Sequence, residues 1–166
     1  MSYNALVEAL TLAKQCAGYT VAGERTEEEI ACAENSLGIV FSRQHREYLR
    51  RVGGLSLYGI DVFGIYPSNT AGILEGDTVA YTLNERRSYD LPLKWIALIS
   101  LEEGYMGFLD YGNLNNNGEP PVIVARVVED KYVFNMVENE DLGDFLLRIV
   151  EIRMKLQDGL ATLNLI

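Results

Sequence analysis

The sequence predicts an α+β fold, in which a mostly antiparallel sheet is flanked by N-terminal helices and a C-terminal helix. Apolar residues recur at helical spacing near both ends of the chain, whereas residues 95–135 consist of short β-rich stretches separated by turn-forming residues. Consecutive strands of this kind pair mainly antiparallel. With 166 residues, of which 48% are hydrophobic, the chain is expected to form a single domain over residues 1–166.

Three helices are expected before the sheet. The second is the best marked, because the Thr26 hydroxyl can cap its first turn and Glu29 stands where a capping box needs it. Gly38 is expected to end this helix in a left-handed conformation. Ser42 can cap the third helix. The three expected helices cover residues 2–17, 26–38 and 42–52.

Strand patterns begin after the third helix. Residues 77–89 carry both helix and strand signals, and we predict a helix there. A last helix is expected to begin at Asn139 or Asp141 and to end at Gly159. The expected strands are residues 55–58, 60–63, 95–98, 105–110, 122–127 and 132–135. The apolar residues that recur at helical spacing in the last helix are Leu142, Phe145, Leu146, Ile149, Ile152 and Leu156.

The composition points to a soluble protein of a reducing compartment. No apolar run approaches the roughly 20 residues that a membrane-spanning helix needs, and the N-terminus lacks the features of a secretory signal. Only two cysteines, Cys16 and Cys32, are present. We therefore expect a cytoplasmic location.

The charge of the chain restricts the class of partner. Lys and Arg total 14 against 24 Asp and Glu, a formal net charge of -10. Nucleic acids and anionic membranes are bound largely through cations, so neither is an expected partner. An acidic surface instead speeds the encounter with a basic protein. The alternative interpretation is that the acidic residues only keep the chain soluble.

None of the motifs that resemble catalytic or metal sites is complete. His45 is the only histidine and lies in the middle of an expected helix, which favours a packing role. Residues Gly54–Tyr58 begin like a nucleophile elbow around Ser56, but a tyrosine replaces its final glycine and no histidine follows. Residues Asn113–Gly118 mimic half of a calcium loop without its acidic ligands and indicate a turn. We therefore predict no enzyme, no catalytic residues, no cofactor and no metal.

Acidic residues in loops are the candidate contacts with a protein partner. Glu75 and Asp77 lie in a stretch that is longer than a plain connection needs. Glu102 and Glu103 lie between two expected strands. Loops of this kind often carry binding residues, although a solubility role explains the same charges.

Short motifs spread over most of the chain point to a family. They are Ile30, Glu34, Leu37-Gly38, Tyr48-Leu49, Gly53-Gly54, Gly59, Gly118-Glu119-Pro120-Pro121-Val122 and Asp144-Phe145-Leu146. Together they resemble the SUKH superfamily, the domain of the Smi/Knr-type yeast cell-wall regulators and of many bacterial immunity proteins. Two positions depart from the family pattern. Ser42 stands where proline is usual, and His45 where an aromatic residue is usual. Neither departure threatens the fold, since serine is itself a good cap.

The resemblance implies an α+β domain that binds proteins and has no shared catalytic residues. In bacteria it implies an antidote that occludes a toxin domain, often a nuclease encoded beside it. Such toxins tend to be basic, so a net charge of -10 would favour the encounter. The leading hypothesis is therefore an immunity protein with one cognate, basic toxin. A regulatory scaffold domain of the Smi/Knr type and a hydrolase using Ser56 or His45 are the alternatives. Neither the partner's identity nor the oligomeric state follows from the sequence.

Overall fold

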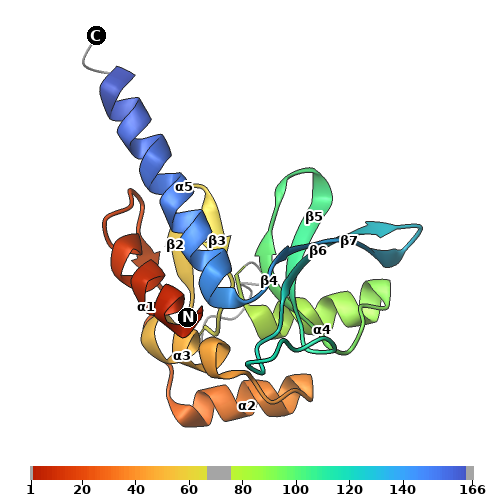
Figure 1. Ribbon diagram of the computed structural model, residues 1–166. Helices are drawn as coiled ribbons and strands as arrows, with labels where there is room; N and C mark the ends of the chain where they lie inside the picture. The colour runs from red at the N-terminus through yellow and green to blue at the C-terminus, as the bar shows by residue number, and fades with distance from the viewer. Residues whose placement is uncertain (1, 67–75, 164–166) are drawn as a thin grey trace.

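The computed structural model describes residues 2–66 and 76–163 of the chain (Figure 1). The elements in chain order are α1 (Ser2–Ala13), β1 (Thr20–Val21), α2 (Glu27–Leu37), α3 (Arg43–Val52), β2 (Leu55–Leu57), β3 (Ile60–Val62), α4 (Thr78–Tyr89), β4 (Trp95–Ser100), the 3-10 turn η1 (Glu102–Gly104), β5 (Tyr105–Asp110), β6 (Val122–Val128), β7 (Lys131–Asn139) and α5 (Leu142–Leu163).

The strands form one seven-stranded sheet in the order β1-β2-β3-β4-β5-β6-β7, and each strand is antiparallel to the next. This confirms the predicted α+β class with N-terminal helices and a C-terminal helix. The predicted helix at residues 77–89 is also confirmed, and it lies between β3 and β4. The short strand β1 was not predicted, because two residues carry no periodicity.

Each face of the sheet has its own apolar core. Side-chain alternation along β4 sends Ile96 and Leu98 into the core shared with α1, α3 and α5, and Ala97 into a smaller core. Helix α4 packs beside β4 against both cores, with Val79 and Leu83 on the first and Tyr81 on the second. The hydroxyl of Thr78 donates to the Ala97 carbonyl (2.6 Å), and Thr82 accepts from the Ala97 amide (2.9 Å). Helix α4 therefore completes the hydrogen bonding of β4 beyond the short strand β3.

The helix starts follow the predicted caps. Thr26 and Glu29 form the full capping box of α2, and Gly38 ends that helix at φ 69°. The last helix begins after Asp141, one of the two predicted starts, whose carboxylate accepts from the Asp144 amide (3.0 Å).

Two predicted helix ends are wrong. Helix α1 ends at Ala13, although the prediction extended it to residue 17. Helix α5 passes through Gly159 and continues to Leu163. A glycine ends a helix where the chain turns left-handed, and Gly159 does not have a positive φ. An interior glycine costs a helix only about 1 kcal/mol, which the rest of α5 tolerates.

The glycine motifs mark a close crossing of the backbone beside β2. A Cβ atom on Gly64 would lie 1.6 Å from the Gly53 carbonyl oxygen, and one on Gly53 would lie 2.1 Å from the Gly23 oxygen. The same Gly53 oxygen accepts from the Ile65 amide (2.7 Å). Three chain segments thus meet at a distance that only glycine permits.

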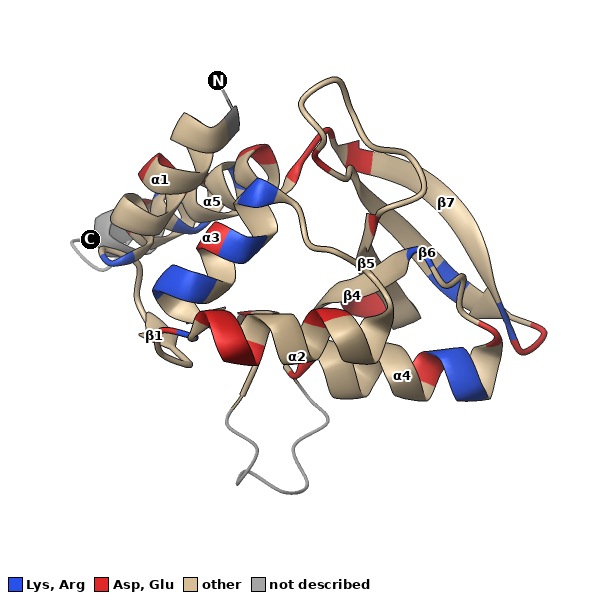
Figure 2. Cartoon of the chain, turned by 90° about the horizontal axis from the view of Figure 1, so that it is seen from below, with Lys and Arg blue, Asp and Glu red and all other residues tan. Residues whose placement is uncertain are grey.

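The view from below shows the sheet edge-on, with β7 at its outer margin and α4 beneath the strands (Figure 2). None of the helices in residues 2–66 and 76–163 is long and apolar enough to cross a membrane.

Candidate protein-binding groove

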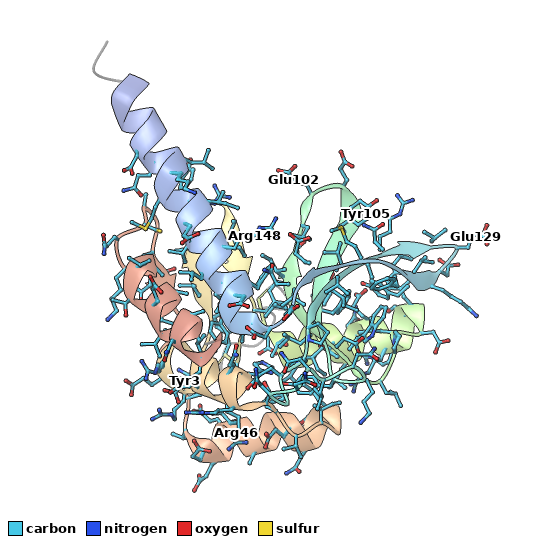
Figure 3. The ribbon with its side chains drawn as sticks, viewed as in Figure 1. Tyr3, Arg46, Glu102, Tyr105, Glu129 and Arg148 are labelled. Carbon is cyan, nitrogen blue, oxygen red and sulfur yellow. The ribbon has the colours of Figure 1, made fainter. Side chains whose placement is uncertain are left out.

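An open groove of about 660 Å³ lies between α5 and the β4–β7 part of the sheet. Figure 3 shows Arg148 on the α5 side of this space, with Glu102 and Tyr105 on the β4–β5 hairpin across from it. Most of the lining is apolar. The apolar and aromatic side chains that line the groove are Ile60, Ile99, Leu101, Tyr105, Val124, Met136, Phe145, Ile149 and Ile152.

The groove exists because α5 is longer than the core that it covers. Leu142, Leu146 and Val150 are buried against the sheet and the other helices. Further along, Ile152 and Leu156 continue the same apolar stripe but are about half exposed. The helix projects past the body of the molecule (Figure 1). Part of its apolar stripe therefore faces solvent beside the sheet.

The groove carries charges of both signs. Arg148 forms an ion pair with Glu138 of β7 and reaches Asn139 (3.4 Å). Arg153 also lines the groove, and its Nε atom is buried without a hydrogen-bond partner among the described residues. Glu102 lies on the opposite wall. A partner that enters the groove would therefore meet an apolar surface bordered by an arginine and a carboxylate.

The hairpin tip at the groove and the β6–β7 tip at the far end of the sheet are both acidic and hold unusual backbone conformations. Glu103, at the β4–β5 tip, has φ 58°. Glu129 and Asp130 form the two-residue turn between β6 and β7, with φ 50° and 61°. Such turns favour Asn-Gly, since each left-handed residue other than glycine costs about 1 kcal/mol. Acidic residues thus occupy tip positions where backbone geometry alone would favour other residues.

The predicted contact residues fall in separate places. Glu102 and Glu103 lie together at the β4–β5 tip, and Glu102 lines the groove. Asp77 lies at the start of α4 and does not line the groove. Its carboxylate accepts from the Ala80 amide (2.8 Å) and the Tyr66 amide (3.4 Å), so it caps the helix. Glu75 lies outside the described residues. A role in binding stays a prediction for all four residues.

Sequence reasoning missed the exposed apolar surface of β7, of which Met136 lines the groove. The predicted strand 132–135 ended inside β7, which runs to Asn139. Val133, Phe134, Met136 and Val137 are all exposed on this strand. The sequence signal for this surface is the stretch Val133–Val137, in which four of the five residues are apolar. A strand with only one buried face should instead alternate apolar and polar residues.

The other candidate sites have structural roles. His45 is buried against Phe41, with 4.3 Å between ring centroids, and its Nδ1 lies 2.9 Å from the Tyr111 hydroxyl. Burial lowers the pKa of His45 to about 3. In the loop predicted as a turn, the Asn115 side chain accepts from the Asn117 amide (2.9 Å) and from the Glu119 amide (3.1 Å). The described part of the chain holds no cluster of three or more His, Cys, Asp or Glu suited to a metal.

Comparison with known families agrees with the fold. The family model SUKH_5, described as SMI1-KNR4 cell-wall, matches residues 4–151. The match takes in α1 to β7 and the first part of α5, and ends before the exposed part of that helix. No curated protein matches the chain. Members of this family are generally non-catalytic. Since the match covers nearly the whole chain, the protein belongs to the SUKH family of SMI1-KNR4 cell-wall domains.

Proposed function

We propose that this SUKH domain binds a basic protein in the groove between α5 and strands β4–β7, and that it serves as an immunity protein that occludes a toxin domain. The observation that carries the proposal is the groove itself. It combines about 660 Å³ of open volume with half-exposed apolar side chains and an acidic hairpin tip. Contiguous exposed apolar surface of this kind typically marks a binding site.

The composition of the groove fits a protein partner. Tyr105, Met136 and Arg148 belong to residue types that are enriched at protein interfaces. Their arrangement also matches a common interface layout, with apolar residues at the centre and charged residues at the rim. A flat, polar surface would give no such support.

The net charge of -10 supports a basic partner. Glu102 and Glu103 lie at the hairpin tip beside the groove, and Glu129 and Asp130 lie at the β6–β7 tip at the far end of the sheet. Their field would attract a basic domain and raise its association rate at low salt. A nuclease toxin, which needs cations to hold its nucleic acid, is a partner of this charge.

If a neighbouring gene encodes a basic toxin domain, the test is a titration of that domain with this chain, followed by calorimetry and by the toxin's own activity. We expect tight binding that weakens between about 30 and about 300 mM salt, together with loss of toxin activity. Absence of binding to a purified, basic neighbouring toxin would contradict the immunity role.

A double variant of the groove tests whether the partner binds at the groove or elsewhere on the chain. Replacing Met136 and Ile152 by serine should weaken binding by about 30-fold or more, because both lie half-exposed on the groove wall. The matched control replaces Val40 and Leu93, which are 81% and 71% exposed away from the groove, by serine. Equal losses for the two double variants would contradict the groove as the site.

A regulatory scaffold domain is the second candidate, and the family description SMI1-KNR4 cell-wall favours it. A pull-down separates the two functions. A single tight partner supports the immunity protein, whereas several weak partners that compete for the groove support the scaffold.

A further inference from the structure

The outer edge of β7 is long, open and apolar. It is the last strand of the sheet, and in the described part of the chain it pairs only with β6. Its nine residues include five consecutive exposed positions, Val133–Val137. The four apolar side chains among these are between 46% and 53% exposed. Figure 2 shows the strand at the margin of the sheet. Such an edge is a template for pairing with another chain.

The strand β7 forms part of the groove wall as well as the edge of the sheet. The β6–β7 register shifts twice along β7, which marks bulges near Asn135 and Glu138. Bulges redirect side chains, and Asn135, Met136 and Glu138 all line the groove. A segment paired with β7 would therefore lie along one wall of the groove.

The opposite face of β7 also offers apolar contacts. Phe134 pairs with Ala125, and Val137 pairs with Ile123, and both partners belong to the smaller core. Paired residues share a face of the sheet, so Phe134 and Val137 extend that core to the edge. An added strand would place alternate side chains beside Met136 on one face and beside Phe134 and Val137 on the other.

The charges at the two ends of β7 favour a basic partner strand over a second copy of the chain. Glu129 and Asp130 precede the strand and Glu140 follows it, while Glu138 is already paired with Arg148. The cation on the strand itself is Lys131. A second copy of the chain, paired antiparallel, would bring the acidic turn of one copy near Glu140 of the other. Like charges therefore oppose self-pairing, whereas a strand with basic ends would be attracted.

We propose that β7 accepts an extended segment of the basic partner as an eighth strand of the sheet. The segment alternates apolar with small polar residues and carries Lys or Arg at both ends. This inference rests on the proposed function and deepens it, because it states how the partner would continue from the groove onto the sheet.

The test uses synthetic peptides and the full chain. The probe alternates Val and Thr and has two lysines at each end, and one control peptide carries glutamates in place of the lysines. A second control carries a central proline, which cannot pair as a strand. Amide hydrogen exchange of residues 131–139 is followed with each peptide. We expect the lysine peptide to slow this exchange about tenfold or more, and the proline peptide to leave it unchanged. The glutamate peptide should bind at least about tenfold more weakly at low salt.

A double variant of the edge locates the contact. Phe134 and Val137 are exposed, so replacing both by serine should leave the chain folded and weaken the lysine peptide about tenfold. The Val40→Ser variant is the control and should bind like the wild type.

Three results would overturn strand addition. They are no slowing at β7 with the lysine peptide, slowing confined to other residues, or slowing that depends on chain concentration without peptide. The last would mean that a second copy occupies the edge. None of these results affects the toxin titration, which tests the groove through Met136 and Ile152. Failure of the two proposals is therefore distinguishable.

Discussion

The two edges of the sheet differ in length and in exposed apolar surface. The short edge, β1, has two residues, both exposed, and Ala22 beyond it extends the pairing with β2 by donating to the Gly54 carbonyl (2.9 Å). The open edge, β7, has nine residues and exposes Val133–Val137. Proteins usually shorten or cover sheet edges to prevent unwanted pairing. One edge is shortened in this way, whereas the other is long and interrupted only by two bulges, as the proposed binding of a partner strand requires.

The largest effect is expected from Gly64→Ala, at the backbone crossing beside β2. The new Cβ atom would lie 1.6 Å from the Gly53 carbonyl oxygen, and backbone on both sides leaves no side chain to move away. We expect a loss of at least about 4 kcal/mol in the free energy of unfolding, or failure to fold. Urea denaturation measures it. Wild-type stability of Gly64→Ala would contradict the close approach of the Gly64 and Gly53 backbones.

A matched pair of methionines compares the sheet interior with the open edge. Met106→Ala, on β5, removes a side chain that is 4% exposed and should cost about 2–5 kcal/mol of unfolding free energy. Met136→Ala, on β7, removes one that is 46% exposed and should cost less than about 1 kcal/mol. Both are measured by urea denaturation. Similar losses would mean that β7 contributes to the core and would weaken its assignment as a binding edge.

Buried His45 should make the stability depend on pH. Burial lowers its folded-state pKa to about 3, while the unfolded chain binds the proton near pH 6.5. The unfolded state therefore holds more protons between these values. Stability is full above about pH 6.5 and falls as pH decreases, by about 2 kcal/mol between about pH 7 and about pH 5.

The His45→Phe variant is the control for this pH dependence. It keeps an aromatic ring beside Phe41 but has no proton to bind, so its stability should change less over the same range. Urea denaturation at several pH values compares the two proteins. Equal slopes would assign the pH dependence to carboxylates and not to His45.

The smallest effect is expected at Gly159, in the projecting part of α5. A Cβ atom there would meet nothing within 4 Å, and alanine favours a helix over glycine. Gly159→Ala should therefore raise helicity slightly and stabilise the chain by less than about 1 kcal/mol. Circular dichroism and thermal unfolding measure both quantities. A destabilised variant would show that the helix requires glycine at this position.

The fold was predictable where the signals are local. The capping box at Thr26, the Ser42 cap of α3 and the apolar period of the helices act over a few residues, and these predictions were confirmed. Errors occurred where the outcome depends on neighbours in space. The end of α1 and the passage of α5 through Gly159 depend on tertiary packing, which outweighs intrinsic propensity.

The groove was only partly predictable. Glu102 and Glu103 were chosen because they lie in a turn, and the structure places them at a tip beside the groove. Apolar residues recur on α5 with the same helical spacing from Leu142 to Leu156. The sequence therefore does not show where the sheet stops covering the helix. Ile152 therefore resembled a core residue. The Arg148–Glu138 ion pair joins a helix to a strand, and sequence spacing does not predict such contacts.

The most direct test of the open edge is amide hydrogen exchange of the full chain, alone and saturated with the basic toxin domain that we propose as its partner. We predict slower exchange at residues 131–139 of β7 and along residues 148–156 of α5, with β1 and α2 unchanged. Slowing confined to β1, α2 or α4, with β7 unchanged, would contradict the assignment of the open edge and the groove as the binding surface.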